Sequence, residues 1–317
     1  MKIVLLDGHT TNPGDLSWSA LEALGELVLY DQTAPDQTAE RLRGAEAVLT
    51  NKTEIAAPHM DQSPELKYIG IMATGTDIVD IAAAKERGIT VTNIPMYASN
   101  SVAQLTFALI LELCYRTGLH SVSVIEDLAW SAQAYNSYWL NPLVELDGKT
   151  LGIFGMGRIG ERVARIGQAF GMHVTAYDVY RRDCAGIRWV TPDELFAGAD
   201  VLSLHCPLTM ETEGVVNQHT LAKMKSGAFL INTSRGALVA GQYLADALNG
   251  GRLAGAGLDV LETEPPDADN PLLRAKNVVI TPHIGWATLE ARSRLIQMTA
   301  DNLRAFKNGA PVNRVNQ

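Results

Sequence analysis

The sequence predicts an α/β protein with two lobes, each built on a parallel sheet. Short apolar or β-branched runs alternate with helical stretches in two separate series along the chain. Strands that alternate with helices form parallel sheets with the helices on their faces, so each series predicts one sheet of this kind. The 317 residues, 47% of them hydrophobic, are enough for about two domains.

The first series predicts an α/β lobe close to the N-terminus. Its expected strands are residues 3–6, 27–30, 47–49, 68–72 and 90–92. Its expected helices are residues 16–24, 38–43 and 80–87, the last of them closed by Gly88. A long apolar helix should follow, from residue 99 to about residue 126. Because apolar side chains lie on several of its faces, we expect it to be mostly buried.

The second series predicts a lobe inserted into the first. Its strands begin at Thr150, and the later ones are residues 201–204, 228–231, 255–258 and 278–280. A final helix, residues 289–306, follows the second series, and no third series of strands is present for it to cover. We therefore expect this helix to pack on the first lobe. The predicted domains are residues 1–98 and 288–317 for one lobe and 99–287 for the other. A cleft between two lobes is a common place for a ligand.

A glycine-rich loop at the start of the second series predicts a dinucleotide site. Gly155, Gly157 and Gly160 follow an apolar strand and precede a helix. In such a turn the first glycine permits the bend, the second lets backbone approach a pyrophosphate, and the third allows close packing. Asp178 ends the next strand, eighteen positions after Gly160, where a carboxylate can bind the ribose hydroxyls.

The same carboxylate favours NAD over NADP, because it would repel a 2′-phosphate. Arg181 and Arg182 leave this choice open, since two cations close to Asp178 could neutralise an added phosphate. Their alternative role is a solvated turn.

Composition narrows the class of protein further. A net charge of −9 argues against a dedicated binder of nucleic acid or of an anionic membrane. Three cysteines without metal-type spacing fit a reducing compartment, and we expect no metal site. The N-terminus is too short for a secretory signal, and no apolar run reaches the ~18 residues of a membrane helix. We therefore expect a cytoplasmic protein.

Three polar residues in loops after the later strands are candidates for catalysis. Arg235 offers a permanent cation and a planar fork for a carboxylate or carbonyl oxygen. Glu264 and His283 could form an acid–base pair, because a carboxylate beside an imidazole favours the protonated ring. Each also has a structural interpretation, respectively as a surface ion-pair partner, a solvated loop acid and a cap of a strand end.

Together with the glycine loop, these residues resemble the D-isomer-specific 2-hydroxyacid dehydrogenases. The resemblance covers nearly the whole chain and implies a Rossmann NAD-binding domain inserted into a flavodoxin-like substrate domain. The segments that carry it are residues 73–80, 100–104, 155–160, 205–209, 232–236, 257–260 and 282–285. Gln104 stands where many members carry an acid, which we interpret as a structural change. Glu264 stands where formate dehydrogenases of the superfamily carry glutamine, which favours 2-hydroxy acids.

The resemblance also implies a role for each site residue. His283 would give a proton to the substrate carbonyl, Glu264 would orient it, and Arg235 would hold the 2-oxo acid. Backbone at Thr74 and Gly75 would receive the substrate carboxylate. The implied cofactor site consists of Val102, Gly155, Gly157, Arg158, Ile159, Gly160, Asp178, Cys206, Pro207, Thr212, Thr233, Ser234, Arg235, Asp259 and His283.

Two tryptophans suggest which substrate the pocket takes. The segment that contains Trp286 resembles glycerate dehydrogenases, also called hydroxypyruvate reductases, and a tryptophan there would favour short side chains. Trp139 is the second candidate for the pocket. The expected reaction is hydroxypyruvate to D-glycerate, or glyoxylate to glycolate, and packing between lobes is the alternative role of Trp286.

Two other functions remain open at this point. Another enzyme of the same group, such as a D-lactate or a short phosphoglycerate dehydrogenase, would share every motif. An NAD(H)-sensing corepressor resembling C-terminal-binding protein would keep the same Arg, Glu and His. An aromatic-rich excursion, residues 120–146, fits neither sheet. Together with the family resemblance it predicts a homodimer, because such segments often bury against a partner, and the alternative is a loop packed on its own subunit.

Overall fold

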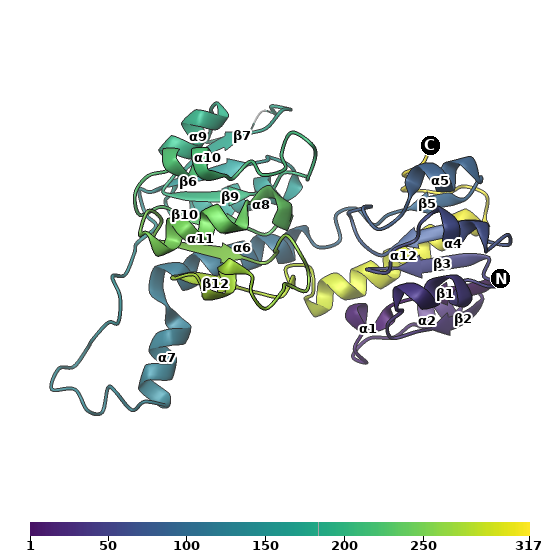
Figure 1. The fold of residues 1–317 in the computed structure, drawn as a ribbon, viewed down its shortest axis with the longest axis horizontal. Helices are drawn as coiled ribbons and strands as arrows, with labels where there is room; N and C mark the ends of the chain where they lie inside the picture. The colour runs from purple at the N-terminus through teal and green to yellow at the C-terminus, as the bar shows by residue number, and fades with distance from the viewer. Residues whose placement is uncertain (183) are drawn as a thin grey trace. The chain divides into compact units, whose positions relative to one another are not determined.

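The computed structural model describes residues 1–182 and 184–317, and its chain divides into two compact units (Figure 1). Unit 1 comprises Met1–Ala98 and Ala287–Gln317. Unit 2 is the continuous segment Ser99–Trp286. Unit 1 is therefore discontinuous in sequence, and the second crossing lies one residue before the position expected from the sequence.

Unit 1 is built on a five-stranded parallel sheet with the order β2-β1-β3-β4-β5, which is the flavodoxin-like order. The strands are β1 (Lys2–Leu5), β2 (Glu26–Leu29), β3 (Ala47–Thr50), β4 (Tyr68–Ile71) and β5 (Thr90–Thr92). The helices are α1 (Gly8–Thr11), α2 (Ser19–Glu22), η1 (Pro35–Gln37), α3 (Thr38–Arg41), α4 (Ala57–Asp61), α5 (Ile81–Glu86) and α12 (Leu289–Lys307).

Both faces of this sheet are covered, as its strand sequences require. Val48 and Ile69 belong to a buried cluster on one face, to which α5 contributes Ala84. On the other face Tyr68 packs against Phe306 of α12, with ring centroids 4.9 Å apart. Side chains alternate between the faces of a strand, so a sheet with helices on both sides needs apolar residues at successive positions.

The C-terminal tail covers the outer edge of β5. Arg314 forms an antiparallel bridge with Thr92, and the backbone N–H of Val315 donates to the carbonyl of Val91. The Asn316 side chain accepts a hydrogen bond from the N–H of Val91. Residues 313–316 thus occupy hydrogen-bonding groups that an open edge strand would leave unpaired.

A bidentate ion pair anchors the start of α12 within unit 1. Arg292 is 8% exposed, and its two terminal nitrogens lie 2.8 and 2.6 Å from the carboxylate oxygens of Asp15. Its Nε donates to the carbonyl of Ala287. The hydrogen bond from Arg292 lowers the pKa of the Asp15 carboxyl below its ordinary value.

Asp15→Asn should therefore lower the melting temperature near neutral pH but not in acid. A carboxyl whose pKa is lowered by folding stabilises the fold above its unfolded pKa, and this contribution is lost as the pH falls through the lower folded value. Melting curves of the variant and the wild type should converge only once the pH falls below the lowered pKa of the folded-state carboxyl. Asp36→Asn, at an exposed position of η1, is the control. A deficit that persists in acid would show that the charge is not the cause.

Unit 2 is built on a seven-stranded parallel sheet with the order β12-β11-β10-β9-β6-β7-β8. The strands are β6 (Thr150–Phe154), β7 (His173–Tyr177), β8 (Ile187–Trp189), β9 (Val201–Leu204), β10 (Phe229–Asn232), β11 (Gly255–Leu258) and β12 (Val278–Ile280). The order reverses between β6 and β9, which is the doubly wound arrangement of dinucleotide-binding domains. The helices are α6 (Ser99–Tyr115), α7 (Thr117–Ile125), α8 (Arg158–Ala169), α9 (Pro192–Gly198), α10 (Gln218–Lys223), η2 (Gly236–Leu238), α11 (Gly241–Asn249) and η3 (Pro271–Arg274).

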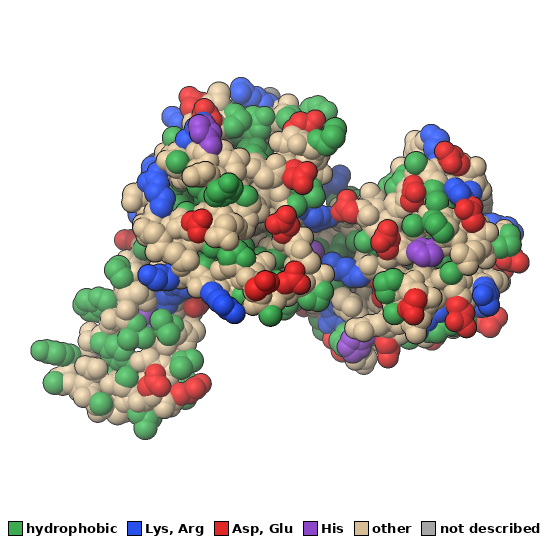
Figure 2. Space-filling model, viewed as in Figure 1, with side chains coloured by type: hydrophobic (Ala, Val, Ile, Leu, Met, Phe, Trp, Pro, Cys, Tyr) green, Lys and Arg blue, Asp and Glu red, His purple; other side chains and the backbone are tan. Residues whose placement is uncertain are grey.

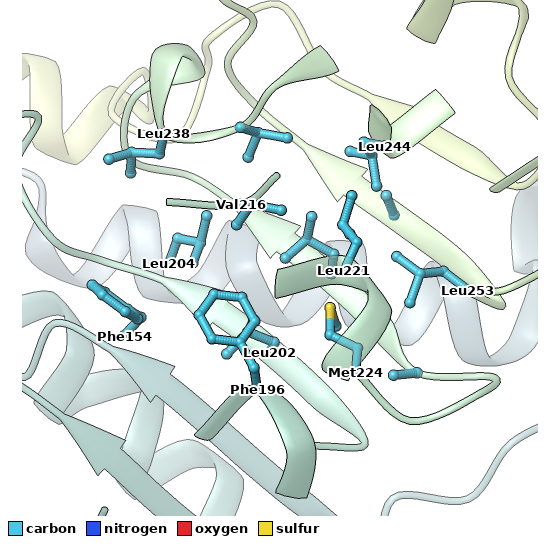
Figure 3. Packing of buried hydrophobic residues seen from close by; sticks show 14 of the residues in the cluster. Phe154, Phe196, Leu202, Leu204, Val216, Leu221, Met224, Leu238, Leu244 and Leu253 are labelled. Atoms are coloured by element: carbon cyan, nitrogen blue, oxygen red, sulfur yellow. The ribbon is translucent and has the colours of Figure 1, made fainter. Parts of the chain in front are cut away.

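Two buried clusters cover the two faces of this sheet. Figure 3 shows the cluster on one side, in which Leu202 and Leu204 of β9 pack against Phe196 of α9 and Leu221 of α10. The cluster on the other side contains Val201 of the same strand, together with side chains of α6 and α8. The alternation along β9 therefore holds the sheet between two helical layers.

The long helix expected for residues 99–126 is in fact two helices. Arg116 adopts a left-handed backbone conformation, with φ of 48°, and the axes of α6 and α7 differ in direction by 57°. No single helix in the part of the chain that the structure describes is long and apolar enough to cross a membrane. Within the described residues, the bent pair of α6 and α7 meets that criterion of length and composition when the two are taken together.

Beyond this break, residues 117–146 form an extension of unit 2 that we call the arm (Figure 1). Its apolar side chains are unusually exposed, and Figure 2 shows them spread over its surface. The largest exposed fractions are 69% for Ile125, 77% for Tyr135 and 66% for Trp139. Exposed apolar surface of this extent indicates an interaction site.

Candidate active site

The loops at the carboxyl edge of the seven-stranded sheet contain most of the predicted site residues. The chain leaves β6 into the glycine loop, β7 at Asp178, β10 at Thr233 and β11 at Asp259. His283 follows β12 in the same way. All seven strands are parallel, so these loops lie at one edge, where open α/β sheets bind their ligands.

The glycine loop has the geometry of a phosphate-binding turn. Gly155 has a φ of 101°, which side chains rarely tolerate, and a Cβ at Gly160 would overlap the carbonyl oxygen of Gly155. A Cβ at Gly157 would meet no atom within 4 Å, so there is room in front of the first turn of α8. The amides of Arg158 and Ile159 belong to that turn and have no acceptor within the helix. The loop therefore fits an anionic ligand.

Asp178 is oriented by the same loop. One of its carboxylate oxygens accepts from the backbone N–H of Met156 at 2.7 Å, and the other accepts from that of Tyr180 at 2.8 Å. The side chain is half-buried at the end of β7. This fixed carboxylate beside the glycine loop is the arrangement that a dinucleotide ribose requires.

Glu264 and His283 form a closely bonded pair. The imidazole Nδ1 lies 2.6 Å from one carboxylate oxygen, and the other accepts from the backbone N–H of Leu261. The side chains of His283 and Glu264 are 26% and 33% exposed. A carboxylate accepts hydrogen bonds, so Nδ1 bears the proton and Nε2 is the nitrogen that can exchange one with a substrate.

Arg235 lies in a loop held against the segment that leads to Glu264. Its backbone carbonyl accepts from the Asn232 side chain at 2.8 Å, and its guanidinium donates to the Ser234 carbonyl. A Cβ on the next residue, Gly236, would overlap the backbone of Leu261. The loops of the arginine and of the glutamate are thus in direct backbone contact.

Comparison with known proteins decides the family. The model of the D-isomer-specific 2-hydroxyacid dehydrogenase NAD-binding domain matches residues 107–285, which is more than half of the chain. The chain belongs to this family. The residues matched lie within unit 2, so unit 2 is the NAD-binding domain of the enzyme.

Individual relatives extend the similarity over the full length. A hydroxypyruvate reductase of Blautia hydrogenotrophica is 48% identical, with all of both chains covered. A glycerate dehydrogenase of Methylorubrum extorquens is 40% identical over 98% of each chain. The crystal structure of a D-lactate dehydrogenase from Aquifex aeolicus, complexed with NAD and lactic acid, has a TM-score of 0.86 and 33% identity, and the match covers 100% of this chain and 99% of that one.

Gly157→Ala in this dehydrogenase should weaken the binding of NADH without disturbing the fold. The added methyl meets no protein atom but occupies the room before α8. We expect the Kd for NADH to rise at least about tenfold, or ~1.4 kcal/mol, at an unchanged melting temperature. Fluorescence titration with NADH measures this. Gly160→Ala should instead lower the melting temperature, and Gly198→Ala, also in open space, should change neither quantity. An unchanged Kd for NADH in Gly157→Ala would show that the glycine loop is not part of the cofactor site.

Several other predicted cofactor residues of unit 2 lie beside these loops. Val102 is 9% exposed on α6, and Thr106 of that helix bonds the Thr233 hydroxyl at 3.1 Å. Ser234 donates to the carbonyl of Cys206. Burial raises the pKa of the Cys206 thiol to about 11, so it stays protonated at neutral pH.

The other predicted site residues belong to different segments of the chain. Thr212 donates to the Pro207 carbonyl at 2.7 Å and so closes the loop after β9. Trp286 is 8% exposed, whereas Trp139 lies on the arm. Thr74 belongs to unit 1, where its hydroxyl donates to the Ile94 carbonyl, and Gly75 follows it after β4. The predicted contacts of all these residues with ligands remain predictions.

One polar residue at the carboxyl edge of the seven-stranded sheet was not among the site residues predicted from the sequence. His205 follows β9, and its Nε2 lies 2.8 Å from the Ser203 hydroxyl. Its Nδ1 is buried and has no hydrogen-bond partner among the described residues. Burial lowers the pKa of His205 to about 3, so the ring is neutral in the working range of an enzyme. Across residues 1–182 and 184–317, no three His, Cys, Asp or Glu residues are grouped as metal ligands.

Proposed function

We propose that this enzyme reduces hydroxypyruvate to D-glycerate with NADH, and that glyoxylate is a second substrate. The relatives named hydroxypyruvate reductase and glycerate dehydrogenase, at 48% and 40% identity, support this choice within the family. The proposed chemistry rests on the 2.6 Å contact between His283 Nδ1 and Glu264. This hydrogen bond orients the imidazole and leaves its Nε2 to exchange a proton with the substrate.

We assign the proton transfer of this reaction to His283 and Glu264. The bound cofactor supplies the hydride that adds to the keto carbon of the substrate. The keto oxygen gains negative charge as the bond forms, and His283 gives it a proton from Nε2. Glu264 stabilises the charged imidazole before transfer and keeps its Nδ1 protonated throughout. In the oxidation direction His283 removes the same proton.

Binding of the 2-oxo acid is assigned to Arg235. The guanidinium offers a fork of N–H groups to the carboxylate and the keto oxygen of the substrate. The backbone N–H groups at Thr74 and Gly75 are expected to receive the carboxylate. Trp286, which is largely buried, is expected to limit the length of the substrate side chain.

A substrate panel tests this assignment. Steady-state rates should be measured with hydroxypyruvate, glyoxylate, pyruvate and a branched 2-oxo acid, each with NADH and with NADPH. We expect the highest kcat/KM for hydroxypyruvate with NADH. A preference for pyruvate would indicate a D-lactate dehydrogenase, and a preference for the branched acid would rule out a short pocket. Preference for NADPH would show that Arg181 and Arg182 outweigh Asp178.

We infer that the arm buries its apolar face against a second copy of the chain. The exposed Ile125, Tyr135 and Trp139 support this, since association would remove their side chains from water. Light scattering coupled to size exclusion should report a dimer for the wild type and a monomer for Ile125→Asp. Val312→Asp, which changes an exposed apolar residue of unit 1, should stay dimeric. A monomeric wild type at micromolar concentration would refute the dimer.

We also propose that the enzyme works in the cytoplasm. Its three cysteines are free, which suits a reducing compartment. Cell fractionation tests this, and recovery outside the cytoplasm would contradict it.

A further inference from the structure

The loop that carries His283 adopts a conformation that needs support from its surroundings. His283 has a φ of 54°, in the left-handed region that residues with a Cβ disfavour. Its backbone N–H donates to the carbonyl of Thr281, two residues earlier, so the turn is very tight. Such a backbone persists only where neighbouring groups determine it. Two side chains that are not close to His283 in sequence make the contacts that do so.

The first is Asp259, which receives hydrogen bonds from both sides of the histidine. One carboxylate oxygen accepts from the hydroxyl of Thr281 at 2.6 Å and from the backbone N–H of Ile284 at 2.8 Å. The other accepts from the backbone N–H of Gly285, also at 2.8 Å. Asp259 is 2% exposed, so these three bonds are shielded from water.

The second is Ser101, in the first turn of α6. Its hydroxyl donates to the carbonyl oxygen of Gly285 at 2.5 Å, and the residue is 6% exposed. Gly285 therefore donates to Asp259 and accepts from Ser101. A Cβ at Gly285 would lie 2.9 Å from the Asp259 carboxylate and 3.5 Å from Val102, so a larger residue does not fit between them.

We propose that Asp259 and Ser101 are positioning residues, which hold the turn so that His283 reaches Glu264 and the substrate at once. The proposal rests on the assignment of His283 as the proton donor. It gives Asp259 a task beyond the cofactor contact expected from the sequence, because both of its oxygens are engaged by the histidine loop. It gives Ser101 a task that the sequence did not suggest.

Two substitutions test the arrangement. Asp259→Asn keeps the size of the side chain but turns one accepting oxygen into an N–H donor that faces other donors. Its kcat at saturating substrate and NADH should fall about 10²-fold, as expected when a reacting group moves by about 1 Å. Ser101→Ala removes one bond, and kcat should fall about tenfold by the same mechanism. The Kd for NADH should stay within about threefold of the wild type in both, because the turn and not the cofactor contact is disturbed.

A second readout does not depend on turnover. The proton shared by His283 Nδ1 and Glu264 should give a strongly downfield proton resonance, assigned by its absence from His283→Ala. We expect the resonance to weaken or disappear in both variants. If the wild type shows it but reduces no 2-oxo acid, the proposed function fails while the positioning role can still be judged.

The controls are a half-buried aspartate and a buried serine, both outside the catalytic loops. Asp200→Asn changes a carboxylate that accepts from the Thr150 N–H at the opposite end of the sheet. Ser63→Ala removes a hydroxyl that donates to the His59 carbonyl in unit 1. Both should keep kcat and the downfield resonance. The proposal is wrong if Asp259→Asn loses only NADH affinity, or if Ser101→Ala keeps the kcat and the resonance of the wild type. If Asp259→Asn does not fold, Ser101→Ala decides alone.

Discussion

His283→Ala should lower kcat for hydroxypyruvate reduction by about 10²–10⁴-fold, the range that a positioned acid contributes. Without the imidazole, the oxygen that gains charge during hydride addition must take its proton from water. The Glu264 carboxylate, which lies 2.6 Å from Nδ1, would also lose its hydrogen bond to the imidazole. Pre-steady-state and steady-state rates at saturating hydroxypyruvate and NADH measure the effect.

The loss should appear in the rate and not in cofactor binding. NADH should bind His283→Ala with an affinity close to that of the wild type, because the glycine loop and Asp178 are unchanged. His219→Ala, on the exposed face of α10, is the matched control and should keep full activity. An active His283→Ala variant would mean that another group protonates the substrate. A biological effect that persists without turnover would revive the interpretation of the protein as a dinucleotide sensor.

Arg235→Gln should lower kcat/KM by about 10²–10³-fold, comparable to the loss of one donor to a developing oxyanion. Arg235→Lys separates two contributions of the side chain, since lysine keeps the charge but lacks the planar fork. We expect lysine to recover only part of the activity, and to raise KM for the 2-oxo acid more than it changes the Kd for NADH. The measurement is a full set of kcat and KM values for the three proteins.

A matched substitution of another arginine separates this effect from a change in net charge. Arg188→Lys alters an exposed residue of β8 and should leave both constants unchanged. If Arg235→Lys had the kcat/KM of the wild type, a point charge would suffice to bind the substrate. The proposal of a bidentate contact between Arg235 and the substrate would then be wrong.

The parts of the fold with a strong repeating pattern were predictable from the sequence. Buried parallel strands such as β3 and β10 are continuous apolar runs, and they lie within a residue or two of the expected positions. The edge strand β8 was not predicted, because only three residues form it and two of them are half-buried. The break at Arg116 was also missed, since arginine favours helices and its left-handed conformation is imposed by the surrounding structure.

For the site, the sequence identified the residue types and one contact between them, but not the contacts that hold the histidine loop. The pairing of Glu264 with His283 was predicted and is confirmed at 2.6 Å. The bonds of Asp259 to the histidine loop depend on β11 and β12 being neighbours, and that of Ser101 spans 184 positions along the chain. No local pattern contains such information, because it arises only when distant segments pack together.

The pairing of the tail with β5 has a consequence for how this protein is made. Residues 313–316 pair with the edge strand β5 of the sheet that contains β1, so this edge cannot be completed before residues 313–316 are synthesised. Unit 2 is continuous, and all seven of its strands are synthesised before Ala287. Domains fold as units during synthesis. During synthesis, unit 2 can therefore be completed before the sheet of unit 1 has its edge covered, although the chain begins with unit 1.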